Sequence, residues 1–190
     1  MPSHIYINKK IPLYNKIIQV SSDKSLSIRS ILLASQAVGI SKISNLLESE
    51  DVLNALKIIK KLGIDYKKKG GLYEIHGYGL NGFNPKDNTI INAGNSGTLG
   101  RLILSLLIKT EKKIKLIGDK SLSKRDFKRV TDPLQKFGAR FVLTNKKNLP
   151  LKIYGSKNLR NINYTEAKGS AQCKSSVIFG GMRTNGITKI

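Results

Sequence analysis

Asn95-Ser96-Gly97-Thr98, followed by Arg101, is a short polar stretch placed directly before an apolar run of helical character. Two further stretches share this form: Lys24-Ser25 with Arg29, and Ser170-Ala171-Gln172 with Lys174. The first turn of a helix presents unpaired N–H groups and a partial positive charge, which favour bound anions. The sequence therefore predicts three helix starts that suit a ligand with several phosphate or carboxylate groups.

The three stretches belong to an internal repeat. Ser25, Ser96 and Ser170 lie 71 and 74 residues apart, and the same order of elements follows the first two. That order is a helix, a basic-apolar strand, an acid-containing turn, a second helix that ends at Gly63 or Gly138, and a closing strand. The third copy reaches a strand at 186–190, where the sequence stops. We therefore expect two complete modules and a third that is truncated.

The pattern of apolar residues predicts alternating helices and short strands, so the expected fold class is α/β or α+β. We expect β-structure before Ser21, at Ile5, Ile7 and 17–20. Helices are expected at 25–38, from Glu50 to Leu62 with Val52, Leu53, Leu56, Ile59 and Leu62 facing inward, at 98–108 and at about 125–137. Strands are expected at 41–43, 72–77, 113–117, 139–144 and 151–154.

Length and composition constrain the number of domains and the cellular compartment only broadly. The 190 residues suffice for one domain, or for one domain and part of another. The single cysteine, Cys173, excludes a disulfide framework and is expected to be a small buried residue. No apolar run approaches the roughly 20 residues that span a bilayer, and residues 1–8 do not resemble a signal peptide. We expect a cytoplasmic protein with no membrane partner.

The formal net charge of +22 raises the alternative of a basic nucleic-acid-binding module. The distribution of the charge argues against it, because 27 lysines are scattered through the chain and only 7 residues are arginine. Arginine is the residue best suited to bidentate contacts with phosphates and bases. We therefore expect no specific nucleic-acid partner.

Four stretches together resemble the successive signatures of the 5-enolpyruvylshikimate-3-phosphate synthase family. They are 22–29 (Ser-Asp-Lys-Ser-Leu-Ser-Ile-Arg), 92–98 (Asn-Ala-Gly-Asn-Ser-Gly-Thr) with Arg101, Gly118-Asp119 with Lys124-Arg125, and 170–174 (Ser-Ala-Gln-Cys-Lys). The resemblance implies a two-domain, inside-out α/β barrel. It places 1–20 in the first strands of one domain and 21–190 in the substrate-binding domain, with modules at about 21–90, 91–160 and 161–190.

The resemblance also implies a reaction. The enolpyruvyl group of phosphoenolpyruvate is transferred to the 5-hydroxyl of shikimate 3-phosphate, and phosphate is released, as a step of the shikimate pathway of aromatic amino acid biosynthesis. The family needs no cofactor, and the full-length enzyme is expected to be a monomer. Because the family's proton-transfer groups lie in the second half of its sequence, we expect this chain to bind shikimate 3-phosphate and to be inactive alone.

The resemblance assigns two overlapping sets of site residues. For shikimate 3-phosphate these are Lys24, Ser25, Arg29, Ser170, Ala171 and Gln172. For phosphoenolpyruvate they are Lys24, Asn95, Gly97, Arg125 and Gln172. Arg101 is expected to brace its loop. Ala171 departs from family members with a second serine, so only its backbone can contact the ligand.

A sugar-nucleotide enolpyruvyl transferase is a further alternative, with the same architecture and chemistry. Such an enzyme usually has a cysteine in the loop that corresponds to 119–125, and this chain has none there. His4 and His76 lie outside the four stretches, and the sequence has no paired cysteine, histidine or carboxylate spacing typical of a metal site. No metal site is therefore expected.

Overall fold

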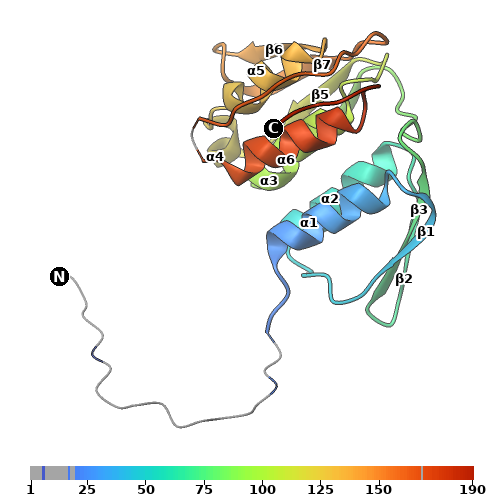
Figure 1. Ribbon diagram of the computed structural model, residues 1–190. Helices are drawn as coiled ribbons and strands as arrows, with labels where there is room; N and C mark the ends of the chain where they lie inside the picture. Colours follow the sequence, from blue (N-terminus) through green and yellow to red (C-terminus); the bar gives the residue numbers. More distant parts are fainter. Residues whose placement is uncertain (1–5, 7–16, 18–19, 168) are drawn as a thin grey trace.

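The computed structural model describes Tyr6, Ile17 and residues 20–167 and 169–190. Apart from Ile17 and Val20, the β-structure expected before Ser21 lies outside the described residues, as does most of the predicted first domain segment 1–20. The alternation of helices and strands that the sequence predicts is confirmed in the described part of the chain (Figure 1).

The first module contains two helices and a sheet of three antiparallel strands. Its elements are α1 (Lys24–Ala34), β1 (Val38–Ile43), α2 (Glu50–Lys61), β2 (Tyr66–Lys69) and β3 (Leu72–Tyr78). The strand order is β1-β3-β2, and β1 pairs with β3 from Val38↔Tyr78 to Ile43↔Tyr73. The left-handed φ of +92° at Gly63 ends α2, at the glycine predicted for this role.

The second module repeats this plan with one more described strand. Its elements are β4 (Thr89–Asn92), α3 (Gly97–Leu106), β5 (Ile114–Ile117), α4 (Lys120–Ser123), α5 (Lys128–Lys136), β6 (Arg140–Thr144) and β7 (Asn148–Tyr154). The strand order is β4-β5-β7-β6, in which β4 and β5 are parallel and the other pairs antiparallel. The last described helix, α6 (Ala171–Gly181), lies in the predicted third module.

Two glycines show that the modules are built alike. A Cβ on Gly77, in β3, would collide with the carbonyl oxygens of Ala34 and Ala37. A Cβ on Gly155, just after β7, would collide with the carbonyl oxygens of Ile108 and Thr110. In both modules the closing strand therefore passes directly over the turn that follows the first helix, which only glycine permits.

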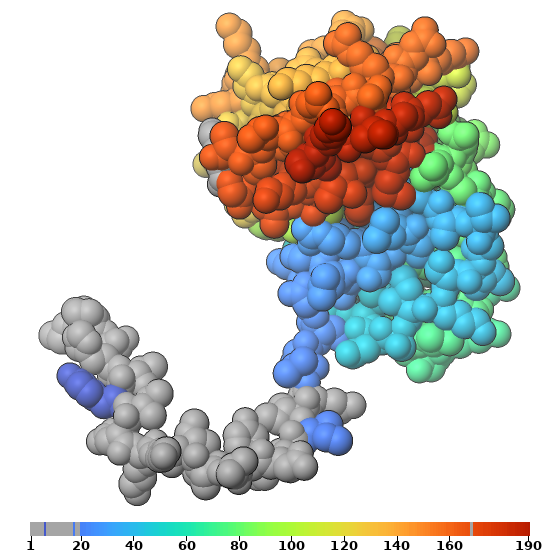
Figure 2. Space-filling view, in the orientation of Figure 1, coloured from blue at the N-terminus to red at the C-terminus, as the bar shows by residue number. Residues whose placement is uncertain are grey.

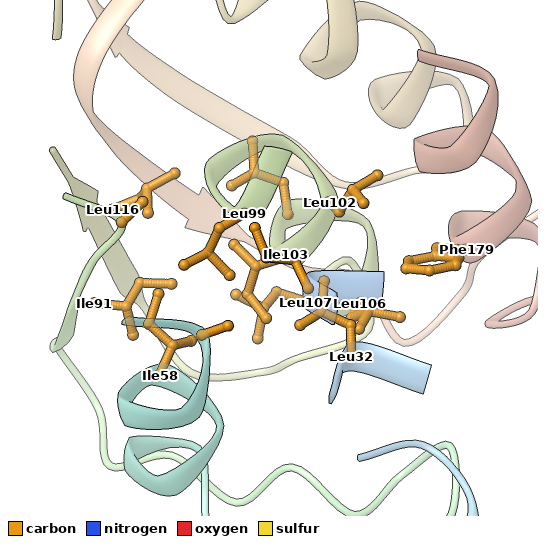
Figure 3. Close-up of a cluster of buried hydrophobic side chains, with 14 of the residues drawn as sticks. Leu32, Ile58, Ile91, Leu99, Leu102, Ile103, Leu106, Leu107, Leu116 and Phe179 are labelled. Atoms are coloured by element: carbon orange, nitrogen blue, oxygen red, sulfur yellow. The ribbon is translucent and has the colours of Figure 1, made fainter. Parts of the chain in front are cut away.

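Helix α3 lies at the centre of the molecule. All of its residues are buried, and it packs against α6, α1 and α5. Figure 2 shows the first module, in blue to green, packed directly against the yellow-to-red remainder of the chain. Figure 3 shows apolar side chains of α3 among residues from five other elements: Leu32 of α1, Ile58 of α2, Ile91 of β4, Leu116 of β5 and Phe179 of α6.

One predicted helix boundary and one predicted inward-facing residue in the first module are wrong. The helix expected at 25–38 ends at Ala34, because Val38 to Ile43 are paired with β3. On α2, Leu53 was expected inside and is 38% exposed, whereas Ile58 is buried.

Two later boundaries also differ. The helix expected at about 125–137 is α5, which begins at Lys128, and a short helix α4, capped by Asp119, precedes it. The strand expected at 186–190 is reduced to a parallel bridge between Asn163 and Lys189. That bridge corresponds to the parallel pairing of β4 with β5 in the second module.

Among the residues that the structure describes, no helix has the length and apolar character needed to cross a bilayer.

The burial of α3 gives a stability prediction. Ile103→Ala, at a fully buried position, should lower the free energy of unfolding by about 2–5 kcal/mol, because it removes apolar contacts and leaves a cavity. The change is measured by urea unfolding followed by circular dichroism. Leu53→Ala is the control, since that side chain is 38% exposed. An equal loss in both variants would contradict the central role of α3.

Candidate functional site

Each of the three polar stretches begins a helix, as the sequence predicts. The N-cap of α1 is Asp23, whose Oδ1 accepts a hydrogen bond of 2.6 Å from the backbone N–H of Leu26. Ser96 caps α3 and Ser170 caps α6, with hydroxyl oxygens that each accept a 3.3 Å bond from an N–H three residues on. Lys24 and Ser25 therefore lie within the first turn of α1, with Asp23 as the cap.

The helices α1 and α6 run in parallel, so their starts lie on the same side of the molecule (Figure 1). Near the starts, Arg29 Nη2 donates to Ser175 Oγ over 3.2 Å. At the far ends, Arg183 Nη1 donates to Gln36 Oε1 over 3.2 Å. Thr98 at the start of α3 accepts a 3.1 Å bond from Gln172 Nε2 of α6, which brings the third start to the same place.

The first stretch holds two cations at the start of α1. Lys24 Nζ lies 2.9 Å from Asp51 Oδ2, in the first turn of α2. The Lys24 side chain is 51% exposed, so its ammonium can also reach a ligand. Arg29 Nη1 donates to the carbonyl oxygen of Ser25 over 3.2 Å, which holds the guanidinium beside the first turn.

Two consecutive hydrogen bonds connect the side chains around the second stretch. Asn95 Nδ2 donates to Asp119 Oδ2 over 2.6 Å, and Asn95 Oδ1 accepts from Arg125 Nη2 over 3.4 Å. Gly97 leaves room for that arginine, because a Cβ there would lie 3.1 Å from Arg125 Nη1. Asp119 thereby orients Asn95, and Asn95 orients Arg125.

The third stretch is joined to the second by Gln172. Its Oε1 accepts a hydrogen bond from Arg101 Nη1, while Arg101 Nη2 donates to the backbone oxygen of Asp126 over 3.3 Å. Both the oxygen and the nitrogen of the Gln172 amide are therefore hydrogen-bonded, because its Nε2 donates to Thr98. Ala171 is exposed at the first turn of α6.

The first turn of α2 closes the arrangement into a ring. A Cβ on Gly94, whose φ is +57°, would lie 2.5 Å from Asn54 Nδ2. Asn54 therefore packs against the loop that leads into α3, and Asp51, one turn earlier on α2, pairs with Lys24. The predicted site residues lie in or next to these helix starts: in α1, in α3 and the loop before it, in α6 and its N-cap, or in the loop before α5.

The charge of this ring is strongly positive. None of the seven arginines, all of which are described, forms a salt bridge with a described carboxylate. Burial lowers the pKa of Arg101 below its ordinary value, and the nearby charges of Arg129 and Arg125 lower it further. A set of cations that destabilise one another in this way is stabilised by a bound anion.

Three residues that hold the site together were not predicted from the sequence: Asp51, Asn54, and Asp119 as the partner of Asn95. Asp51 lies in the first turn of α2, where acidic residues are common for local reasons, and its contact with Lys24 joins two separate helices. For Asp119 the sequence did give an indication, because Gly118-Asp119 is the third of the four stretches that resemble the family.

Among the described residues, no group of three or more histidine, cysteine or carboxylate side chains is placed to hold a metal ion.

Comparison with known proteins agrees with this geometry. The family model described as EPSP synthase (3-phosphoshikimate 1-carboxyvinyltransferase) matches residues 8–190. The chain belongs to the EPSP synthase family. This is the family that the four stretches resemble. The match supports neither a sugar-nucleotide enolpyruvyl transferase nor a basic nucleic-acid-binding module.

Curated relatives and solved structures of EPSP synthases support the assignment. A 3-phosphoshikimate 1-carboxyvinyltransferase of Ruthia magnifica is 44% identical over 91% of this chain and 39% of the relative. One of Vesicomyosocius okutanii is 40% identical over 99% of this chain and 42% of the relative. The structure of EPSP synthase from Acinetobacter baumannii has a TM-score of 0.80 and 34% identity over 86% of this chain and 37% of that one. The chain thus spans about two-fifths of the length of its curated relatives.

Asp119 gives a pH prediction. Hydrogen bonds from the N–H of Leu122 and from the Asn95 amide hold the pKa of this carboxyl below its ordinary 3.8. A lowered pKa in the folded state means that the stabilisation is complete above pH 3.8 and is lost as the pH falls below it. Asp119→Asn keeps a helix cap and removes the charge. The difference in unfolding free energy between the two proteins should therefore shrink on acidification. A difference that is constant with pH would contradict this role.

Proposed function

We propose that this chain forms the shikimate 3-phosphate-binding part of a 3-phosphoshikimate 1-carboxyvinyltransferase. The observation that carries the proposal is the ring of three helix starts, in which Lys24, Arg29, Arg101 and Arg125 converge and the arginines have no carboxylate partner among the described residues. Both substrates of the reaction are anions with a phosphate and a carboxylate, which matches several separate cationic groups.

The proposed reaction is an addition followed by an elimination. The 5-hydroxyl oxygen of shikimate 3-phosphate loses its proton and bonds to C2 of phosphoenolpyruvate while C3 gains a proton, which gives a tetrahedral intermediate. Loss of the C3 proton and of phosphate then restores the double bond. Phosphoenolpyruvate itself supplies the transferred group, so the reaction requires no cofactor. The expectations of a monomer and of a cytoplasmic location accompany this proposal.

Shikimate 3-phosphate is placed between the starts of α1 and α6. Arg29 is held between Ser25 and Ser175, so its planar guanidinium can pair with the ring carboxylate. Ser170 accepts the cap bond from Cys173, and its hydroxyl hydrogen can still donate to the 3-phosphate. Ala171 can contribute only its backbone.

Phosphoenolpyruvate is placed beside the start of α3. Arg125, oriented by Asn95, is the fixed cation for its phosphate or carboxylate, and Gly97 lets the ligand approach the N–H groups of the first turn. Gln172, held by Arg101, contacts both substrates. Lys24 lies between the two anions and is held by Asp51 when they are absent. The charge on Lys24 is therefore oriented before substrate binds.

Calorimetric titration with shikimate 3-phosphate tests the binding site. Lys24→Ala and Arg29→Ala should each weaken binding about tenfold or more, because each removes a charge-assisted hydrogen bond. Lys67→Ala is the matched control, since this exposed lysine lies on β2, outside the ring. Shikimate and inorganic phosphate should bind far more weakly than the intact ligand. Equal binding by all variants of a folded chain would contradict the proposed site.

A second experiment tests turnover. We expect the purified 190-residue chain, mixed with both substrates, to release no more phosphate than its Lys24→Ala variant. The reason is that the resemblance assigns the proton-transfer groups to residues that this chain does not contain. Phosphate release is measured by a coupled colorimetric assay. Release well above that of Lys24→Ala would show that the groups needed for proton transfer are present in the chain.

A further inference from the structure

A second cationic site lies at the opposite ends of the same helices. A cavity of about 370 Å³ is bounded by the loop 81–85, by the end of α3 with the following residues 106–112, and by Arg183 just after α6. The helix starts that form the candidate functional site lie at the other ends of α3 and α6. The cavity is therefore separate from that site, although two helices join them.

Arg183 is the buried cation of this cavity. Its side chain is among the buried polar groups, with 9% of the residue exposed. Nη1 donates to Gln36 Oε1, and buried Nε has no hydrogen-bond partner among the described residues. A guanidinium has five N–H donors, so most of its hydrogen-bonding capacity is not used. Burial lowers the pKa of Arg183 below its ordinary value.

The C-terminal end of α6 accounts for only part of the stabilisation that the buried charge of Arg183 needs. Arg183 follows the C-cap of α6, Met182, and a cation is favoured beside the carbonyl groups at a helix C-terminus. That interaction offsets some of the cost of burying the charge. It does not provide acceptors for the unused N–H groups, and no described carboxylate forms a salt bridge with Arg183. The cavity that Arg183 lines is the place from which an acceptor can reach it.

The rest of the lining adds positive charge. Lys109 and Lys112 are exposed at the cavity, and no described partner neutralises either of them. The one acidic side chain of the lining, Glu111, forms an ion pair of 3.1 Å with Lys157. The ends of α3 and α6 each contribute only about −0.5 of a charge. The three cations therefore outweigh the negative charge around the cavity.

We propose that this cavity binds a small oxyanion, a phosphate or a carboxylate group of a metabolite, with Arg183 as the buried anchor and Lys109 and Lys112 at the mouth. Its volume is within the range of small-molecule sites. The amides of Asn81 and Asn84 and the hydroxyl of Thr110 supply neutral donors around it. An anion bound here would join the loop between the first two modules to the ends of α3 and α6.

Nuclear magnetic resonance of the full 190-residue chain, titrated with inorganic phosphate and separately with malonate, tests this site. The reporters are the Nε–H signal of Arg183 and the backbone N–H of Thr110, whereas the N–H of Gly97 reports the candidate functional site. We expect saturable shifts of Arg183 and Thr110 with at least one of the two anions. Shifts with phosphate alone would assign a phosphate ligand, and shifts with malonate alone a carboxylate ligand. Failure of both anions to move Arg183 saturably would overturn the proposal.

Variants separate the site from the general charge of the protein. Lys109→Gln combined with Lys112→Gln leaves the buried residues intact and should weaken binding at Arg183 about tenfold or more. Lys113→Gln is the matched control, an exposed lysine next to the site that does not line the cavity. Lys24→Ala should leave the Arg183 titration unchanged and alter only the Gly97 signal. An equal weakening by Lys113→Gln, or no weakening by the double variant, would refute the site.

Discussion

The complete burial of α3 is the constraint on which the rest of the structure depends. A helix with no exposed face must be covered on every side, and α1, α5 and α6 supply that cover. Its first turn is therefore fixed relative to the starts of α1 and α6, without any ligand. The bonds of Gln172 to Thr98 and Arg101 and of Arg29 to Ser175 then set the remaining distances. The anion site is thus preorganised by the hydrophobic core beneath it.

The burial of α3 also buries the positive charge of Arg101, which does not favour the stability of the fold. Arg101 lies on α3 with only 8% of the residue exposed, its Nε is without a described partner, and its neighbours include Arg125 and Arg129. A cation removed from water beside like charges lowers the stability of the fold. The apolar contacts of α3 offset this cost. A buried arginine beside two exposed arginines is consistent with a site that is completed by an anionic ligand.

Much of the fold followed from local sequence, because glycines, helix caps and apolar spacing act over a few residues. Gly63 ended its helix where expected, and Ser96 and Ser170 are caps. Predictions failed where distant residues decide the outcome. The strand β1 starts at Val38 because β3 pairs with it, and the contact of Arg101 with Gln172 joins residues 71 apart in sequence. No period or spacing specifies such a contact, so the site's cross-links required the structure.

Because α1 and α6 run in parallel, charges of the same sign gather at each end of the pair. Helices that run side by side in the same direction place their positive ends together and their negative ends together, and both groupings are unfavourable. At the carbonyl ends, Arg183 supplies a buried cation that is bonded to the segment after α1 through Gln36. At the N–H ends, the described protein adds Lys24, Arg101 and Arg125, which increase the positive charge. Asp23, as the cap of α1, and Asp51, paired with Lys24, offset part of this charge. Arg101 and Arg125 have no carboxylate partner among the described residues, so a bound anion has the sign that neutralises them.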